Sequence, residues 1–327
     1  LGVKHVIPCA NGTDALQIAM MGLGLQPGDE VITADFTFAA TVEVIALLQL
    51  TPVLVDVDMN NMNISLDGIR KAITPKTKAI VPVHLFGRAA NMDAIMEIAN
   101  EHNLYVIEDN AQAIGADYTN KNGVKKKVGT IGHVAATSFF PSKNLGCYGD
   151  GGAIYTNDDD LAHIIRGIVN HGMYERYHHD VVGVNSRLDS IQAGVLKAKL
   201  PHLDTYNRAR QDAARKYSLA LGVNPNIVAP TICESCDCHV FHQYVIRITN
   251  GKRDALLAHL QEKGIPCAIY YPIPLHSQKA YADVRYKEED FPVTNQLCKE
   301  VIALPMHTEL DDEQIKFITN TVLEYLK

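Results

Sequence analysis

Apolar segments alternate with segments of helical periodicity along the first half of the chain. Short runs rich in valine and isoleucine predict strands at residues 30–35, 52–58, 78–87, 104–110, 134–140 and 151–157. Between several of these runs, apolar residues recur at helical spacing over residues 13–23, 39–48 and 92–102. Alternating strands and helices are typical of an α/β fold, so we predict a mostly parallel sheet covered by helices on both faces.

The pattern changes after Asp189. A helical stretch over residues 189–200 meets Pro201 and resumes over residues 206–221, and a proline at such a point kinks or ends a helix. A strand follows at residues 243–249, and helices follow at 253–263 and 311–326. We therefore predict a large α/β domain over residues 1–200 and a smaller carboxy-terminal α+β domain over residues 201–327.

Composition narrows the class of protein. The 327 residues carry a formal net charge of -7, which argues against a general nucleic-acid binder because phosphate contacts depend on Lys and Arg. No run approaches the roughly 18 apolar residues of a membrane span, so we expect no membrane insertion.

The chain begins with Leu1 instead of Met, so we expect an absent amino-terminal segment and leave a targeting sequence open. Seven scattered cysteines indicate reduced thiols, which predicts a cytoplasmic protein.

One cysteine cluster stands apart, the run CESCDCH with Cys233, Cys236, Cys238 and His239. Thiolate and imidazole are the ligands that zinc prefers. However, the run has no second ligand pair at zinc-finger spacing, so a surface loop with reduced thiols and no metal is the favoured interpretation.

Two common nucleotide motifs are missing. The run GLGLQPG from Gly22 follows a helix and lacks the glycine spacing of a dinucleotide-binding turn. No segment has the form of a phosphate-binding P-loop. Simple hydride transfer and nucleotide hydrolysis therefore lose their best support.

Two other motifs indicate a phosphorylated ring. The run NGTDAL places Asn11, Gly12 and Thr13 at a helix start, where free amides favour an anion, although a plain helix cap has the same residues. Asp109 ends an apolar strand, where its carboxylate can keep a pyridine nitrogen protonated. An acidic helix cap explains this aspartate equally well. Gln112, one turn further, can donate a hydrogen bond to a ring oxygen.

The third motif is SFFPSKNLGCYGDGG, residues 138–152. Lys143 lies there among aromatic and apolar residues, and burial lowers the pKa of an amine so that it can form a Schiff base. Ser138 stands five residues before it. A helix-start phosphate site, a strand-end Asp, this Ser and this Lys together favour pyridoxal 5'-phosphate (PLP) chemistry.

Along its whole length the chain resembles the DegT/DnrJ/EryC1/StrS family of sugar aminotransferases. The resemblance rests on NGTDAL, DFTFAAT, IEDNAQAIGA, SFFPSKNLGCYGDGG and GVNSRLD, in that order. It implies a fold-type I enzyme that uses PLP to aminate nucleotide-linked keto sugars. One branch of the family has His in place of the lysine and dehydrates its sugar, so Lys143 favours transamination.

The resemblance also implies roles for single residues. Lys143 would form the Schiff base with PLP and then move the proton between cofactor and substrate carbons. Asp109 would pair with the pyridine nitrogen, and Gln112 would contact the phenolic oxygen. The other implied cofactor contacts are Gly12, Thr13 and Ser138 at the phosphate, Phe38 stacked on the ring, and Asn185 at the phosphate of the neighbouring subunit. The last contact implies a homodimer with shared active sites.

The segments HGMYERYHH, KNLGCYGDGG and YYPIPLH look most like one branch of the family. That branch aminates C3 of UDP-2-acetamido-2-deoxy-3-oxo-glucuronate with L-glutamate, for cell-surface polysaccharides such as lipopolysaccharide O-antigen. A carboxylate and a diphosphate call for Arg or His donors. The candidates are Arg176, His178, His179, Arg187, His276 and His307. Two alternatives stay open: a 4-keto-6-deoxy nucleotide-sugar aminotransferase, and a non-catalytic PLP-binding sensor.

Overall fold

The main sheet of the protein is mostly parallel. The computed structural model describes residues 1–232 and 238–327. Within this part, the main sheet has seven strands in the order β1-β9-β8-β5-β4-β2-β3. They are β1 (His5–Cys9), β2 (Glu30–Ala34), β3 (Thr51–Val55), β4 (Thr77–Val81), β5 (Tyr105–Asp109), β8 (Val134–Ser138) and β9 (Gly152–Thr156). The five strands β3, β2, β4, β5 and β8 pair in parallel, whereas β9 and β1 add antiparallel.

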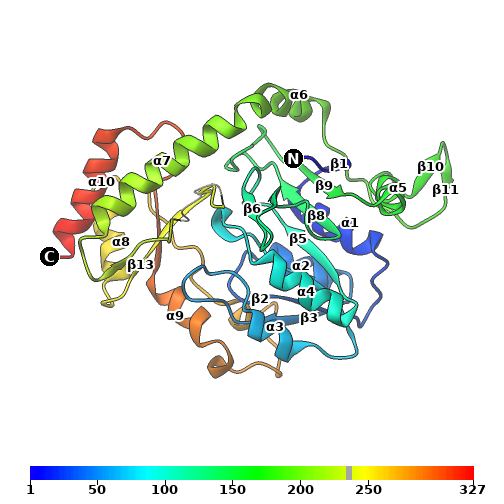
Figure 1. Cartoon of the computed structure of the whole chain (residues 1–327), viewed down its shortest axis with the longest axis horizontal. Coiled ribbons are helices and arrows are strands. Elements are labelled where there is room, and N and C mark those ends of the chain that lie inside the picture. The colour runs from blue at the N-terminus through cyan, green and yellow to red at the C-terminus, as the bar shows by residue number, and fades with distance from the viewer. Residues whose placement is uncertain (233–237) are drawn as a thin grey trace.

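Helices cover both faces of this sheet (Figure 1). They are α1 (Gly12–Gly22), α2 (Ala40–Leu47) and α5 (Asp159–Ile168) on one face, and α3 (Leu66–Ala72) and α4 (Met92–His102) on the other. Neighbouring residues of β2 enter different cores, since Val31 packs with α1 and Ile32 packs with α4. The predicted α/β fold with a covered, largely parallel sheet is confirmed.

The second half of the chain forms a smaller α+β unit. Two helices follow each other directly, α6 (Ser190–Lys199) and α7 (Leu203–Leu221) (Figure 1). The 3-10 turn η2 (Leu200–His202), which contains Pro201, interrupts the α-helical structure between them, as predicted. Helix α7 leads to an antiparallel sheet of β12 (Ile227–Val228), β13 (Tyr244–Ile248) and β14 (Val301–Leu304). Helices α8 (Arg253–Glu262) and α10 (Asp312–Tyr325) pack there on a third core, and α9 (Pro292–Glu300) packs on the first. The exact boundary at residue 200 stays a prediction.

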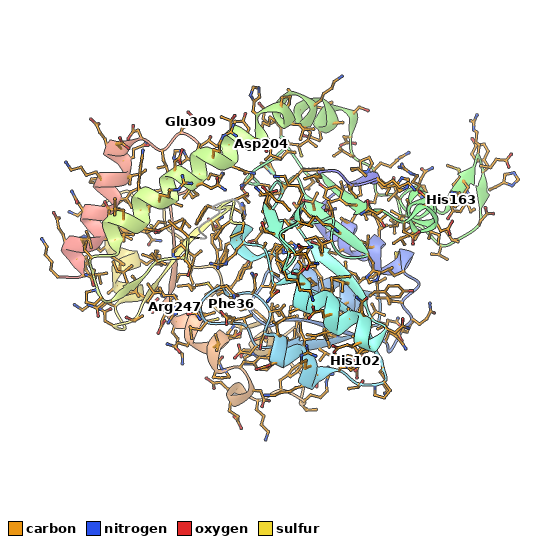
Figure 2. All side chains as sticks on the ribbon, in the orientation of Figure 1. Phe36, His102, His163, Asp204, Arg247 and Glu309 are labelled. Atoms are coloured by element: carbon orange, nitrogen blue, oxygen red, sulfur yellow. The ribbon has the colours of Figure 1, made fainter. Side chains whose placement is uncertain are left out.

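A hairpin projects beyond the body of the molecule. Strands β10 (Met173–Glu175) and β11 (His178–His179) form this arm, which we define as residues 173–179 (Figure 1). Tyr174 stacks on His163 of α5 at 4.4 Å between ring centroids, and Figure 2 labels His163 at the base of the arm. A second small hairpin pairs β6 (Asp117–Thr119) with β7 (Lys125–Lys127).

The described residues include no helix that is long and apolar enough to cross a membrane. Among the same residues, the cysteines Cys9, Cys147, Cys267 and Cys298 are free, as expected. Cys238 is disulfide-bonded, so the expectation of a reduced thiol is wrong for this residue.

Candidate active site

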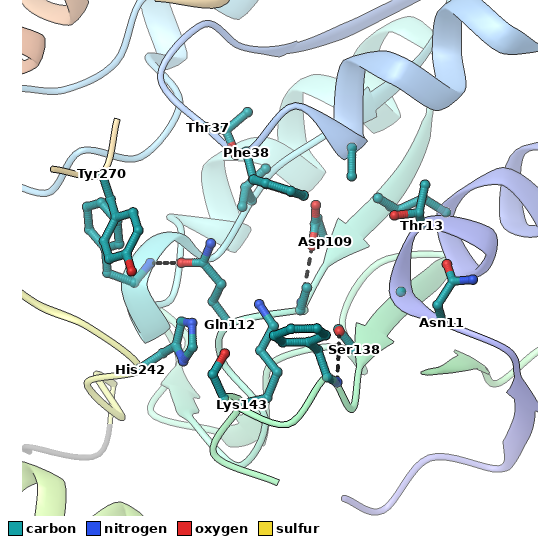
Figure 3. A pocket seen from close by; sticks show the side chains of 18 of the residues that line it. Asn11, Thr13, Thr37, Phe38, Asp109, Gln112, Ser138, Lys143, His242 and Tyr270 are labelled. Carbon is teal, nitrogen blue, oxygen red and sulfur yellow. Dashed lines mark hydrogen bonds between the residues drawn. The ribbon is translucent and has the colours of Figure 1, made fainter. Parts of the chain in front are cut away.

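A cavity of about 580 Å³ opens at the carboxyl ends of β5 and β8. Its lining comes from the first turn of α1, the segment before α2, the ends of these two strands, the loop after β8, and two segments from the second half of the chain (Figure 3). Ligands of open α/β sheets bind outside the carboxyl ends of the strands. The cavity lies in that position and has the size of a small-molecule site.

The first turn of α1 approaches β8 very closely. Asn11 caps the helix, because its Oδ1 accepts a hydrogen bond from the Asp14 amide at 2.8 Å. A Cβ on Gly12 would lie 2.7 Å from the Cβ of Ser138, so this position needs glycine. The close approach places the amides of the helix start beside the Ser138 hydroxyl, an arrangement suited to an anion.

Asp109 ends β5 as a buried carboxylate. Its Oδ2 accepts a hydrogen bond from the Thr41 hydroxyl at 2.8 Å, and its Oδ1 accepts one from the Ala111 amide at 3.1 Å. Burial raises the pKa of Asp109, while these bonds and the charge of Lys143 act in the opposite direction. A cation placed against this carboxylate would therefore be strongly favoured.

A second buried carboxylate holds the end of β5 in place. Glu108 accepts hydrogen bonds from the Gly129 and Gly132 amides at 2.7 and 2.6 Å and from Nε2 of His84 at 2.9 Å. The Nδ1 of His84 accepts from the Ala90 amide, which fixes the tautomer that donates to Glu108. Although burial opposes ionisation, the bonds from His84 and the amides keep the pKa of Glu108 below its ordinary value. This network supports the strand that carries Asp109.

Lys143 enters the cavity from the loop after β8. Its backbone amide donates to the Phe140 carbonyl at 2.9 Å, and a Cβ on Gly146 would collide with the Pro141 carbonyl, so the loop folds back tightly. Burial lowers the pKa of the Lys143 amine, and the charge of Asp109 opposes that shift. An amine with a lowered pKa is partly neutral and hence nucleophilic.

Gln112 joins the cavity to an aromatic wall. Its Oε1 accepts a hydrogen bond from the Phe86 amide at 2.6 Å, and its Nε2 donates to the Tyr271 hydroxyl at 3.2 Å. The Phe86 and Tyr271 rings stack at 6.3 Å between centroids. Because both ends of the amide already have partners, the predicted contact with a ring oxygen stays a prediction.

The structure brings most of the predicted cofactor residues together. The cavity lining contains Gly12, Thr13, Phe38, Asp109, Gln112, Ser138 and Lys143. Asn185 is exposed and lies outside the lining, although the neighbouring Ser186 is buried and donates to Asp14 of α1. Its predicted role on a neighbouring subunit stays a prediction.

The predicted substrate residues do not line this cavity. Arg176, His178, His179, Arg187 and His307 are exposed. His276 is buried in η3 (Leu275–Ser277), where its Nδ1 and its amide both bond the Asp35 carboxylate at 2.7 Å. It also stacks on Phe291 at 4.4 Å between ring centroids. These contacts fasten η3 to the end of β2, and substrate binding by His276 stays a prediction.

Several lining residues were not predicted from the sequence. Among them are Thr37, Phe86, Phe140, His242, Gln243, Tyr270 and Tyr271. Tyr270 and Tyr271 belong to the run YYPIPLH, but a ring in such a run is more often packing than a ligand contact. His242 directly precedes the residues of a predicted strand, and a polar residue at that point was the available signal.

The prediction of no metal site concerns a stretch that is only partly described. Cys233 and Cys236 lie outside the described residues. No group of three potential metal ligands is present among the residues that the structure describes. The His239 Nδ1 accepts a hydrogen bond from the Phe241 amide at 3.1 Å, and burial together with the charge of Arg88 lowers the pKa of His239 to about 3.

The residues of the cavity fit PLP. Asp109 offers a buried negative charge for a protonated ring nitrogen, and Lys143 offers an amine with a lowered pKa. Two buried polar atoms in the lining, Thr37 Oγ1 and His242 Nδ1, have no hydrogen-bond partner in the described part of the chain. Buried polar atoms without partners are uncommon in folded proteins, and where they line a cavity they can bond a ligand bound there. This fold and site define a PLP-dependent aminotransferase.

Comparison with known proteins gives the family. Residues 1–323 match the DegT/DnrJ/EryC1/StrS aminotransferase family, so the chain belongs to it.

Three relatives of similar length are among the most similar. A protein of Geobacillus stearothermophilus named "Pleiotropic regulatory protein" is 48% identical, and the match covers 99% of this chain and 86% of that protein. UDP-2-acetamido-2-deoxy-3-oxo-D-glucuronate aminotransferase of Pseudomonas aeruginosa is 49% identical, covering 97% and 85%. UDP-N-acetyl-3-dehydro-alpha-D-glucosamine 3-aminotransferase of Acidithiobacillus ferrooxidans is 47% identical, covering 98% and 84%.

Solved structures agree with this assignment. A DegT/DnrJ/EryC1/StrS aminotransferase from Brucella abortus superposes with a TM-score of 0.93 at 42% identity, covering 99% of this chain and 87% of that one. NtdA from Bacillus subtilis, solved with bound cofactor PMP (pyridoxamine phosphate), has a TM-score of 0.90 at 30% identity, with coverage of 99% and 74%.

Proposed function

We propose that this protein aminates C3 of UDP-2-acetamido-2-deoxy-3-oxo-glucuronate with L-glutamate as donor. The observation that carries the proposal is the cavity with Lys143 and Asp109, in a chain that is 49% identical to an aminotransferase of that name. L-Glutamate gives up its amino group and becomes 2-oxoglutarate, and the transferred amino group replaces the C3 keto oxygen of the sugar. The product would serve cell-surface polysaccharide synthesis in the cytoplasm.

In this proposal, residues of the cavity hold the two ends of PLP. The amides of Gly12 and Thr13 and the Ser138 hydroxyl would hold the phosphate at the start of α1. Asp109 would pair with the ring nitrogen, and the Thr41 hydroxyl keeps that carboxylate oriented. When bound, PLP acts as an electron sink that makes the α-carbon of the donor acidic.

Lys143 is the base that moves the proton. Burial lowers the pKa of the Lys143 amine, which favours the neutral form of Nζ that accepts the α-proton of L-glutamate. The same atom later gives a proton to C3 of the sugar. The short turn around Phe140 and Gly146 fixes the loop that carries Lys143, so one amine can serve both half-reactions.

The proposal includes a homodimer. Phe140, which lines the cavity, is 51% exposed, and Tyr148, five residues after Lys143 along the chain, is 76% exposed. Large apolar side chains exposed at the mouth of a site are typical of a surface that a partner covers. A second copy would bring Asn185 to the phosphate and the arm, with Arg176 and His178, to the sugar.

The two half-reactions give a direct test. L-Glutamate should convert the holoenzyme from the PLP to the PMP spectrum, and a keto sugar should reverse the change. Single-turnover rates should be compared for UDP-2-acetamido-2-deoxy-3-oxo-glucuronate, for UDP-N-acetyl-3-dehydroglucosamine, which lacks the carboxylate, and for a 4-keto-6-deoxy nucleotide sugar. We expect the first to react fastest. Faster reaction of either other sugar would reject the proposed substrate, and no response to L-glutamate would indicate a sensor.

A further inference from the structure

His242 is a buried polar side chain in the cavity lining, and the proposed mechanism does not use it. It lies just before β13, lines the cavity and is only 7% exposed. Figure 3 shows it near Tyr270, at the end of the cavity opposite Asn11 and Thr13. A phosphate held at the start of α1 leaves the His242 end for the substrates.

One nitrogen of the His242 ring has no hydrogen-bond partner among the residues that the structure describes. This atom, Nδ1, is buried. Burial, the charge of Lys143 and the charge of Arg210, in that order, push the pKa of His242 well below its ordinary value. A neutral ring with a free polar atom in a cavity wall is suited to bind a polar ligand group.

The backbone that carries His242 is held firmly. Arg210 of α7 donates from NH1 to the carbonyls of Phe241 and His242, at 3.1 and 3.3 Å. A Cβ on Gly87 would lie 3.0 Å from the His242 nitrogen, so the chain is also packed from behind. Phe241 has a φ of 45°, which is strained for a bulky residue, and such strain is often kept at functional sites.

The charge of this wall favours an anion. Arg210 is buried, and no carboxylate pairs with it among residues 1–232 and 238–327. Lys143 adds a second basic group near His242. Of the carboxylates that line the cavity, Asp109 is bonded to Thr41, and Asp150 is exposed. The positive charge of Arg210, which lies outside the cavity lining, acts on the His242 ring, so an anion beside that ring would be attracted.

We propose that His242 binds a carboxylate of the substrate at the end of the cavity away from α1. This inference rests on the proposed function, which offers two sources of that carboxylate: the amino donor and the hexuronate sugar. Both present the same chemistry to the ring, and binding experiments separate them.

The test measures equilibrium binding to the holoenzyme with non-reacting ligands. Glutarate represents the donor, and UDP-glucuronate represents the sugar, with UDP-glucose as its match without the carboxylate. Wild type, His242→Phe and His242→Asn are compared, and His259→Asn serves as the control at a histidine remote from the cavity. Circular dichroism and thermal melting show whether each variant folds, and His242→Asn keeps a polar group if the Phe ring packs poorly.

We expect His242→Phe to weaken either glutarate or UDP-glucuronate about 10- to 100-fold, the loss of a charge-assisted hydrogen bond, with UDP-glucose unchanged. The ligand that weakens identifies the source of the carboxylate. Unchanged binding of both carboxylates, or an equal loss for UDP-glucose and UDP-glucuronate, would overturn the inference. If wild type bound neither UDP sugar, the proposed function would fail instead, and the glutarate result alone would decide the role of His242.

Discussion

The cavity and the arm of this protein differ in almost every physical respect. Asp109 and Thr41 are buried, each oxygen of the Asp109 carboxylate has a donor, and the end of β5 meets α2 there within hydrogen-bond distance. On the arm, Arg176, His178 and His179 are exposed, and Arg176 makes a hydrogen bond and a cation–π contact with its neighbour Tyr177. Residues of both regions were predicted to bind ligands, but the predicted residues of the arm do not line the cavity.

This difference suggests that the residues for the reaction and the residues for substrate recognition lie in different regions of the molecule. Residues that perform the reaction must be preorganised, so they lie at the ends of buried strands and are held by the core. Residues that recognise a large nucleotide sugar can come from a projecting segment, which a second subunit can bring to the cavity. The following predictions test this separation, from the largest expected effect to the smallest.

Removal of the amine should abolish chemistry. Lys143→Ala should slow the conversion of PLP to PMP by L-glutamate by roughly 10⁴-fold, because the variant lacks the amine that accepts the α-proton. Stopped-flow absorbance measures the rate. Lys143→Arg keeps the charge but is not a base at neutral pH, so it should be nearly as slow. A rate near that of wild type in either variant would contradict the role of Lys143.

The charge of Asp109 should matter more than its hydrogen bond. Asp109→Asn should lower the rate of the first half-reaction about 10³-fold, since an amide cannot stabilise a protonated ring nitrogen. Thr41→Val removes the donor to Oδ2 and should cost about 10-fold, whereas Thr41→Ser keeps the hydroxyl and should cost little. Equal rates for Thr41→Val and Thr41→Ser would show that the hydroxyl does not orient the carboxylate.

The neighbouring subunit should complete the site. Lys143→Ala and Asn185→Ala proteins should each be poorly active at limiting PLP, but mixed after unfolding and refolding together they should recover about a quarter of the wild-type sites if subunits pair at random. The recovery arises because one mixed site has both Lys143 and Asn185. Failure of the mixture to exceed either variant, despite formation of mixed dimers by mass spectrometry, would argue against a shared site.

The close approach at α1 should be sensitive to a single methyl group. Gly12→Ala should destabilise the protein by about 1–3 kcal/mol and weaken PLP binding, because its Cβ would press on Ser138. Gly194→Ala is the matched change in α6, where an added Cβ meets nothing within 4 Å, and it should stabilise by up to about 1 kcal/mol. Urea unfolding measures both, and a loss of similar size at Gly194 would remove the local explanation.

Some residues of the cavity could be predicted from the sequence and others could not, and the reason is whether a local pattern marks them. The strand that ends in Asp109 and the loop with Lys143 have local signals, namely a run of apolar residues and a lysine among aromatic residues, and both lie in the cavity. His242 and Tyr271 reach the same cavity from more than 90 residues further along, through the packing of β13 and the aromatic wall. No local pattern encodes such an approach. For His276 the sequence suggested substrate binding, but its ring bonds the Asp35 carboxylate instead. No local pattern shows this contact, because Asp35 lies more than 200 residues earlier in the chain.

The most direct test of the chemistry of this cavity is to locate the bound cofactor. The purified holoenzyme is treated with borohydride, which fixes PLP covalently on the lysine that holds it, and the digested protein is examined by mass spectrometry. We predict that the added mass lies on the peptide with Lys143, and that prior treatment with L-glutamate prevents labelling. A label on another lysine, or a label that L-glutamate does not prevent, would contradict a transaminase centred on Lys143.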